Sequence, residues 1–200
     1  MCRLIETICL ENGEILRASY HNARMNAARK ELFGITESMD VERIINQSFA
    51  DRTRCRITYG REVESVEYFP YRLRQVRTLN LVRAEADMDY HLKYADRACL
   101  DGLFAQRGSA DDVLVVKDGR ITDTSIGNVA LFDGNEWHTP VRPLLRGTHR
   151  QYLLDAGLLV ERDIKVAELS NYVSIRVFNA MIHWGEVEIP LSAVGLACKG

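Results

Sequence analysis

One lysine stands in a stretch whose pattern changes midway. In "MDYHLKYADRACL", residues 88–100, apolar and polar residues alternate as far as Lys93, and this period of two predicts a half-buried strand. Leu100, Leu103 and Phe104 then recur at helical spacing. We therefore expect Lys93 where a strand ends and a helix begins. An amine there is either a solvated edge residue or a partly desolvated nucleophile, and the local sequence leaves both open.

Three further side chains could act together with such an amine. Asp123 shares the alternating face of Ile121 on a predicted strand, and a carboxylate on a buried face needs a cation or a hydrogen-bond donor. Thr148 follows Gly147 at a predicted helix start, where free N–H groups favour a phosphate. Arg24, early in another predicted helix, could add a guanidinium to the same anion. An amine, an acid and an anion-binding helix start are the parts that would hold pyridoxal phosphate.

Each of these residues also has an ordinary structural explanation. Lys93 can be a surface residue, and Asp123 can bond backbone N–H groups beside a turn. Thr148 can be a plain helix cap, and Arg24 can face solvent. Spacing alone favours these explanations over a cofactor site.

The composition is that of a globular chain with a sizeable core. Its 200 residues are 46% hydrophobic, enough for one large domain or two small ones. The formal net charge of −2 provides no global basic field for nucleic acid, and we expect neither a membrane-spanning segment nor a leader. The scattered cysteines predict reduced thiols in a cytoplasmic protein, several of them in the core. They are Cys2, Cys9, Cys55, Cys99 and Cys198.

The first half of the chain predicts a small α+β domain, residues 1–86. Two strands flank Asn12-Gly13, a strong hairpin pattern. A helix follows with Asn22 as its N-cap and Gly34 as its end, and residues 40–49 form a short helix. Alternation then predicts three strands within residues 54–60, 63–69 and 74–84.

The second half predicts a larger domain, residues 87–200, that carries Lys93. Hairpins turn at Asp118-Gly119 and at Asp133-Gly134. A helix opens with the capping-box pattern Thr148-x-x-Gln151 and stops near Gly157. Mixed strands and a short helix complete the chain, and no repeat or low-complexity segment is visible.

The order of these motifs resembles the class IV aminotransferases, the fold-type IV pyridoxal-phosphate enzymes. The pieces that carry the resemblance are "ETICLENGEILRASYHNARM", "HLKYADR", "DGRITDTSIGNVALF", "HTP" and "LLRGTHR". The family includes branched-chain and D-amino-acid aminotransferases and 4-amino-4-deoxychorismate lyase. The resemblance spans most of the chain and implies a two-domain α+β fold like that of D-amino-acid aminotransferase, with a shortened N-terminal segment.

The resemblance also implies roles for individual residues. Lys93 corresponds to the lysine that bonds the cofactor aldehyde and, once released, moves the proton at the substrate carbon. Asp123, five residues before Asn128, takes the place of a glutamate that pairs with the ring nitrogen. Arg24 and the helix start at Thr148 and His149 would hold the phosphate, where the family commonly has Gly-Ile-Thr-Arg instead of Gly-Thr-His-Arg. The family's late phosphate-binding turn is replaced by "FNAM", residues 178–181, and no role is carried over to it.

Two reactions compete as the activity. Lyases of the family resemble "K-x-L-N-R", and Asp96 and Arg97 stand at the matching offsets, with Asp for Asn. Branched-chain aminotransferases have a tyrosine five residues after the lysine, where this chain has Ala98. We therefore expect a lyase that eliminates pyruvate from aminodeoxychorismate to give 4-aminobenzoate for folate synthesis. The alternative is an aminotransferase for a branched-chain or D-amino acid.

Other classes of protein are weaker interpretations. Arg72, Arg74 and Arg77 alternate, so one could clamp a substrate carboxylate, although a solvated strand face explains them better. A degenerate, non-catalytic binding protein would have no reason to retain Lys93 and Asp123 together with Arg24. We expect a small amine or amino-acid substrate, a homodimer by resemblance, and neither nucleic acid nor membrane as partner.

Overall fold

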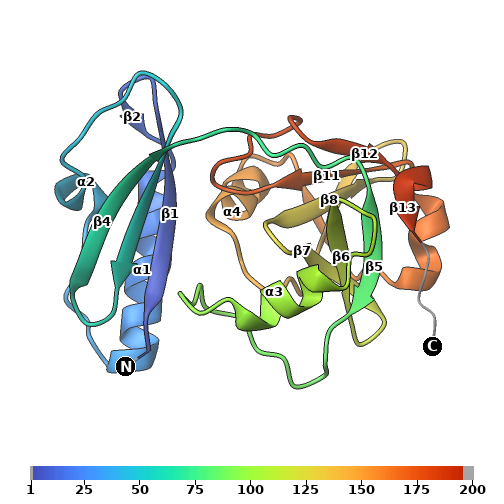
Figure 1. Cartoon of the computed structure of the whole chain (residues 1–200), viewed down its shortest axis with the longest axis horizontal. Helices are drawn as coiled ribbons and strands as arrows, with labels where there is room; N and C mark the ends of the chain where they lie inside the picture. The colour runs from blue at the N-terminus through green and yellow to red at the C-terminus, as the bar shows by residue number, and fades with distance from the viewer. Residues whose placement is uncertain (1, 196–200) are drawn as a thin grey trace. The chain divides into compact units, whose positions relative to one another are not determined.

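The structure, a computed structural model, describes residues 2–195 (Figure 1). Contacts group these residues into two compact units. The smaller unit contains the chain up to Leu73 together with Leu92–Asp96, and the larger unit contains Arg74–His91 and the chain from Arg97 onward. The expected division at residues 86 and 87 differs from these units, because Arg74 already belongs to the larger unit and Lys93 to the smaller.

The smaller unit is an antiparallel sheet in the order β2-β1-β3-β4 with two helices. Its elements are β1 (Leu4–Glu11), β2 (Glu14–Ile15), α1 (Ala18–Phe33), α2 (Val41–Ile44), β3 (Thr53–Tyr59) and β4 (Val63–Pro70). A long α1 and the strands β1 and β3 supply most of the core, to which Leu4, Ile8, Leu10, Met25, Ala28, Cys55 and Ile57 belong. Leu4, Ile8 and Leu10 lie on one face of β1, whose other face is largely buried as well.

Helix α1 begins earlier than the sequence predicts. Its N-cap is Arg17, whose left-handed backbone (φ 58°) turns the chain directly from β2 into the helix. Asn22, expected as the cap, lies inside the helix, where its side chain donates to Asp40 and accepts from the Val41 N–H at 2.8 Å. The expected N-cap is therefore wrong, while Gly34 ends the helix as predicted with φ 68°.

Residues 88–93 do not form the predicted strand. The Asp89 carboxylate accepts the His91 N–H at 3.0 Å, which turns the chain instead of extending it. Beyond this turn the Lys93 carbonyl accepts the Ile5 N–H and the Ala95 N–H donates to Arg3, both at 2.9 Å. The segment Leu92–Asp96 thus attaches to β1 by an isolated bridge, and the next helix, α3 (Ala98–Ala105), starts five residues after Lys93.

The larger unit is built on a nine-stranded sheet in which β8 pairs with three neighbours, β7, β9 and β11. Its further elements are β5 (Leu79–Arg83), β6 (Asp112–Lys117), β7 (Arg120–Thr124), β8 (Asn128–Phe132), β9 (Trp137–Pro140), α4 (Thr148–Asp155), β10 (Val160–Arg162), the 3-10 helix η1 (Val166–Asn171), β11 (Ser174–Phe178), β12 (Glu188–Pro190), the 3-10 helix η2 (Leu191–Ala193) and β13 (Val194–Gly195). The path of neighbours runs β10-β9-β8-β7-β6-β5-β13, and β12 lies beyond β11.

Both predicted hairpins of the larger unit form. Asp118 and Gly119 have φ values of 50° and 74°, the two positive values that a tight two-residue turn requires. The second hairpin joins β8 to β9 through Gly134, at φ 105°. The strand predicted within 74–84 is shorter than expected, because only Leu79–Arg83 pair in the sheet.

The predicted environments of the cysteines can be compared with the structure of residues 2–195. Cys9 and Cys55 are buried free thiols, as expected of core cysteines, whereas Cys198 lies outside the described residues. None of the helices described is both long enough and apolar enough to span a bilayer.

Candidate active site

Asp123 is a buried carboxylate held on both oxygens. The Asn128 side chain donates to Oδ1 at 2.8 Å, and the Leu145 N–H donates to Oδ2 at 3.0 Å. Burial raises the pKa of Asp123 to about 6, although these two donors act in the opposite direction. The carboxyl group is therefore fixed in place mainly by neutral donors, in the part of β7 next to β8.

Asn128 links Asp123 to the start of helix α4. Its amide also donates to the Leu145 carbonyl at 2.8 Å, so that one side chain holds both the acid and the segment before the helix. A Cβ at Gly147 would collide with the Asn128 Oδ1, which explains why this position has no side chain. The sequence spacing of Asp123 and Asn128 thus corresponds to a direct contact across the β7–β8 pair.

Thr148 is the first residue of α4 and is buried. Gly147 is the N-cap, and no side chain caps the helix, so the predicted capping box is not formed. Thr148 is thus placed at the helix start as expected but does not act as the cap. The first N–H groups of an α-helix and its dipole favour an anion at this end.

His149 is anchored to a distant turn. Its Nδ1 lies 2.7 Å from the Asn179 carbonyl, which can only accept, so Nδ1 carries the proton. The ring also packs edge-on against Phe178. Asn179 lies in the "FNAM" stretch, where no role was predicted, and its side chain accepts the N–H groups of Met181 and Ile182.

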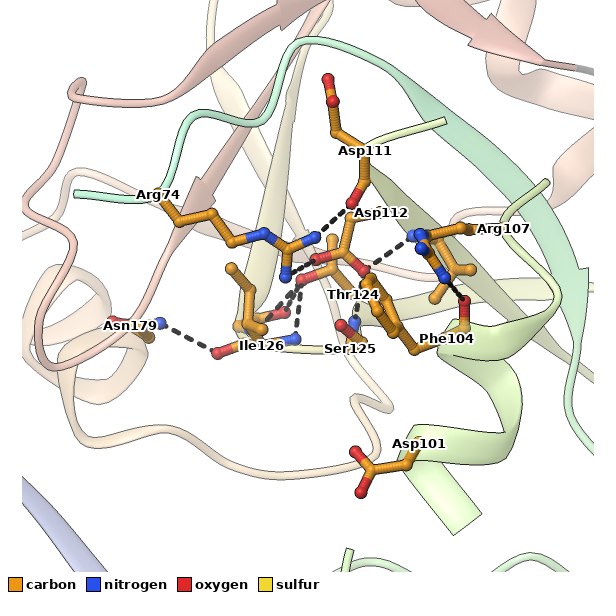
Figure 2. A network of polar contacts seen from close by, with 12 residues as sticks. Arg74, Asp101, Phe104, Arg107, Asp111, Asp112, Thr124, Ser125, Ile126 and Asn179 are labelled. Atoms are coloured by element: carbon orange, nitrogen blue, oxygen red, sulfur yellow. Dashed lines mark hydrogen bonds and ion pairs between the residues drawn. The ribbon is translucent and has the colours of Figure 1, made fainter. Parts of the chain in front are cut away.

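The turn between Asp123 and Asn128 is fixed from several sides (Figure 2). The Thr124 hydroxyl oxygen accepts the Gly127 N–H at 3.0 Å, and the Asp112 carboxylate accepts the Ser125 N–H at 3.3 Å. The Asn179 amide donates to the Ile126 carbonyl at 2.9 Å. The same residue that anchors His149 thus also anchors this turn.

Arg74 belongs to this network and not to a solvated strand face. Its guanidinium bonds the Asp111 carbonyl and lies 3.5 Å from the buried Asp112 carboxylate (Figure 2). The guanidiniums of Arg74 and Arg107 lie 4.9 and 4.1 Å from the centre of the Phe104 ring. Arg74 therefore has a structural role within the larger unit.

In the smaller unit, Arg24 is oriented by a buried glutamate. Its Nε and Nη2 donate to the two carboxylate oxygens of Glu6 at 2.9 and 2.5 Å, and His21 Nδ1 donates to Glu6 at 2.6 Å. Burial alone would raise the pKa of Glu6, but the charge of Arg24 and the His21 hydrogen bond lower it to about 2. Burial lowers the pKa of His21. The cluster holds one guanidinium in a fixed orientation.

Lys93 is half-buried and is held through its backbone by β1. It therefore shares the smaller unit with Arg24, whereas Asp123, Thr148 and His149 lie in the larger unit. Within the larger unit, Asn128 holds Asp123 and the segment before α4, and Asn179 holds His149 and the turn that follows Asp123.

Two supporting residues, Glu6 and Asn179, are not among the residues predicted from the sequence. Glu6 falls on the same alternating face as Leu4 and Ile8, so a carboxylate on an apolar face was a sign of a buried ion pair. Asn179 gave no comparable sign, because its partners Ile126 and His149 lie 53 and 30 residues away along the chain.

Comparison with known sequences decides the family. The family model described as Amino-transferase class IV matches residues 3–188. The chain belongs to the class IV amino-transferases. A protein from Haemophilus influenzae Rd, described only as uncharacterised, is 37% identical over 186 residues, covering 90% of this chain and 98% of the relative.

Solved structures agree with this membership and with the expected fold-type IV architecture. A protein from Haemophilus somnus 129PT, described as a candidate 4-amino-4-deoxychorismate lyase, superposes with a TM-score of 0.86 at 32% identity, covering 92% of this chain and 98% of that one. A PLP-bound protein from Mycobacterium tuberculosis, described as a hypothetical aminotransferase, shares the fold, with a TM-score of 0.75 at 18% identity, covering 96% of this chain and 81% of that one.

Proposed function

We propose that this class IV protein binds pyridoxal phosphate and acts as a 4-amino-4-deoxychorismate lyase, with Lys93 as the catalytic amine. The observation that carries the cofactor assignment is the buried Asp123 carboxylate, fixed by Asn128 and Leu145 beside the start of α4. A carboxylate whose pKa burial has raised is suited to a protonated ring nitrogen, because a cation would restore its ionised form.

The remaining residues suit the phosphate end of the cofactor. The N–H groups that follow Gly147 and the Thr148 hydroxyl offer donors at a helix start, and Arg24 offers a guanidinium that Glu6 orients. His149 would reach a phosphate only through Nε2, since Nδ1 is bonded to Asn179. These donors match the chemistry of an aromatic phosphate with a basic ring nitrogen.

Lys93 would provide the proton transfer. The bound cofactor supplies an electron sink that stabilises negative charge on the substrate carbon. The Lys93 amine would bond the cofactor aldehyde at rest, and after displacement by the substrate amine it would move the proton at that carbon. Asp123 would keep the ring nitrogen protonated, so that negative charge developing on the substrate remains stabilised.

The lyase assignment is supported by two observations. Asp96 and Arg97 follow Lys93 at the lyase-like offsets, and the Arg97 guanidinium donates to the Ser125 carbonyl at 2.8 Å, next to the turn that carries Asp123 and Asn128. The similarity to the Haemophilus somnus protein points to the same reaction. An aminotransferase for a branched-chain or D-amino acid is the second candidate, because Asp123 would pair with the ring nitrogen in the lyase reaction and in amino-group transfer alike.

The cofactor assignment is tested by the visible spectrum of the purified chain with added pyridoxal phosphate, before and after borohydride reduction. We expect a cofactor band that reduction fixes covalently on Lys93. Lys93→Ala should lose this band, and the exposed Lys30→Ala should keep it. Absence of a band in the unaltered chain would refute the cofactor assignment and favour the non-catalytic binding protein.

The reaction is tested on the loaded protein. With 4-amino-4-deoxychorismate we expect pyruvate and 4-aminobenzoate, whereas amino acid and keto acid pairs should give no exchange of amino groups. Asp123→Asn should lower kcat by roughly 100-fold or more, since it removes stabilisation of charge that develops only during the reaction. Exchange of amino groups without pyruvate release would establish the aminotransferase instead.

A further inference from the structure

The larger unit contains a cavity that none of the proposed cofactor residues lines. Its volume is about 320 Å³, at the lower end of the roughly 300–1,000 Å³ typical of small-molecule sites. Three segments form its walls: the turn 88–91, the hairpin 117–122, and the loop 142–144. The lining residues are Met88, Asp89, Tyr90, His91, Lys117, Asp118, Arg120, Thr122, Arg142, Pro143 and Leu144.

The cavity lies against the face of β7 opposite Asp123. Arg120 and Thr122 line it, whereas Asp123 has the alternate position on the strand. Two consecutive residues of the neighbouring loop also face different sites. Leu144 lines the cavity, whereas the Leu145 N–H donates to Asp123 in the candidate active site. The cavity and the candidate active site are thus separate but share a strand and a loop.

Several of the charges in the cavity wall are already paired. His91 Nδ1 lies 2.6 Å from the Asp89 carboxylate, and Arg120 Nε lies 2.7 Å from Asp163. Lys117 donates to the Met88 carbonyl, and its charge also lies close enough to the Asp89 carboxylate to help lower the pKa of that group. These contacts hold the turn 88–91 and the hairpin in place around the cavity.

The balance of charge in the wall favours an anion. No hydrogen bond or ion pair joins Arg142, or the Asp118 carboxylate, to another of the residues 2–195. Lys117, Arg120 and Arg142 are the cations of the wall and Asp89 and Asp118 are its carboxylates, so the lining has a formal net charge of +1 with His91 neutral. A guanidinium binds a carboxylate through two parallel hydrogen bonds.

The rest of the wall is apolar. Met88, Tyr90, Pro143 and Leu144 contribute carbon surface, and Tyr90 and Leu144 are buried. A ligand that matches this wall has one negative group and a compact hydrocarbon body. We propose that this cavity binds a small carboxylate with an apolar, ring-sized body, with Arg142 as the anchor of the carboxylate and Lys117 as a second cation.

Titration calorimetry with benzoate tests the site on the full chain loaded with pyridoxal phosphate. Benzamide, which has the same ring without the charge, and inorganic phosphate, which has charge without a ring, are the comparison ligands. We expect saturable benzoate binding, little binding of benzamide and weak binding of phosphate. Arg142→Gln and Lys117→Gln should each weaken benzoate binding roughly 10-fold or more, because each removes a charged hydrogen-bond donor.

The control variant is Arg146→Gln, an exposed arginine of the same loop that does not line the cavity. It should bind benzoate like the unaltered chain. Equal affinity in the Arg142, Lys117 and Arg146 variants would place benzoate elsewhere and overturn the proposal, as would the absence of saturable binding. Phosphate binding that depends on Arg142 and is tighter than benzoate binding would overturn the assignment of a carboxylate. Because binding is measured without turnover, a failed lyase assay does not affect the result.

Discussion

Glu6 and Asp123 are both buried carboxylates, yet their pKa values move in opposite directions. Burial raises the pKa of each carboxyl group, but the positive charge of Arg24 lies beside Glu6 and helps to lower the pKa of Glu6 to about 2. Asp123 is met by an amide and a backbone N–H, which are neutral, and its pKa rises to about 6. At the scale of single residues, the identity of the partner decides the protonation state more than burial does.

The Glu6 cluster should make a large and pH-dependent contribution to stability. Glu6→Gln leaves Arg24 and His21 without their carboxylate and should lower the free energy of unfolding by about 3 kcal/mol at pH 7. Because the pKa is lowered from 4.5, this contribution is complete above pH 4.5 and is lost as the pH falls toward 2. Urea denaturation from pH 3 to pH 8 measures it.

The matched control is Glu64→Gln, which breaks the Arg3–Glu64 pair on the surface of the same unit. An exposed pair of this kind contributes at most about 1 kcal/mol. A Glu6→Gln variant as stable as Glu64→Gln, or a difference from the unaltered chain that does not shrink at low pH, would contradict the ion-pair explanation.

At the scale of elements, the turn between β7 and β8 positions Asp123 and Asn128 because it packs closely against the end of β11. A Cβ at Gly127 would lie 2.5 Å from the Phe178 carbonyl oxygen, and this oxygen belongs to the backbone of a paired strand. The Phe178 carbonyl oxygen therefore cannot rotate away as a side-chain atom could. The close packing of the turn against β11 therefore requires a residue without a side chain at position 127.

Gly127→Ala should therefore destabilise the protein by about 1–3 kcal/mol, the usual cost of overpacking. Gly102, in the interior of α3, has open space around its Cβ position, so Gly102→Ala should be neutral or stabilising by about 0.5–1 kcal/mol. Thermal unfolding of the two variants compares them directly. Equal melting temperatures for both would show that the turn can shift without cost.

Elements specified by neighbouring residues could be predicted from the sequence, and elements specified by distant ones could not. Asn12-Gly13 and Asp118-Gly119 form their turns because the required backbone angles depend on those residues alone. The alternation at residues 74–78 suggested a strand, but Arg74 bonds Asp111 and Asp112, and the Arg77 N–H bonds the Asp111 carboxylate. These partners lie more than thirty residues away in sequence.

The same distinction applies to the candidate site. Asp123 and Asn128 could be recognised together because their spacing across one hairpin is local. The support that Glu6 gives Arg24, and that Asn179 gives His149, crosses 18 and 30 residues. Resemblance to a family provided the residues that would contact the cofactor, but only the structure provides the residues that hold them.

At the scale of the whole molecule, the smaller unit depends on a segment that returns to it from the larger one. Leu92 lies in the core around Leu4 and Ile8, and Tyr94 packs against that core. Lys93, between them, is therefore positioned by the packing of its two neighbours as well as by its backbone bond to Ile5.

Leu92→Ala should loosen the smaller unit selectively, at a cost of about 2–4 kcal/mol for a buried leucine. Hydrogen exchange resolved along the chain should show faster exchange in β1 and β3, with β6 and β8 still protected. Leu158→Ala, at a position that is 49% exposed, is the control and should leave both units protected. Equal loss of protection in both units would show that they unfold as one.

The return of residues 92–96 also limits how such a gene can be rearranged. A single cut anywhere in the coding sequence leaves one product without part of its unit, because the smaller unit needs residues from both sides of Arg74–His91. Recombination could therefore not transplant the smaller unit as one stretch without also removing Arg74–His91 from the larger unit. Insertions within the larger unit, by contrast, could enter the exposed turn near Glu85 without separating Lys93 from β1.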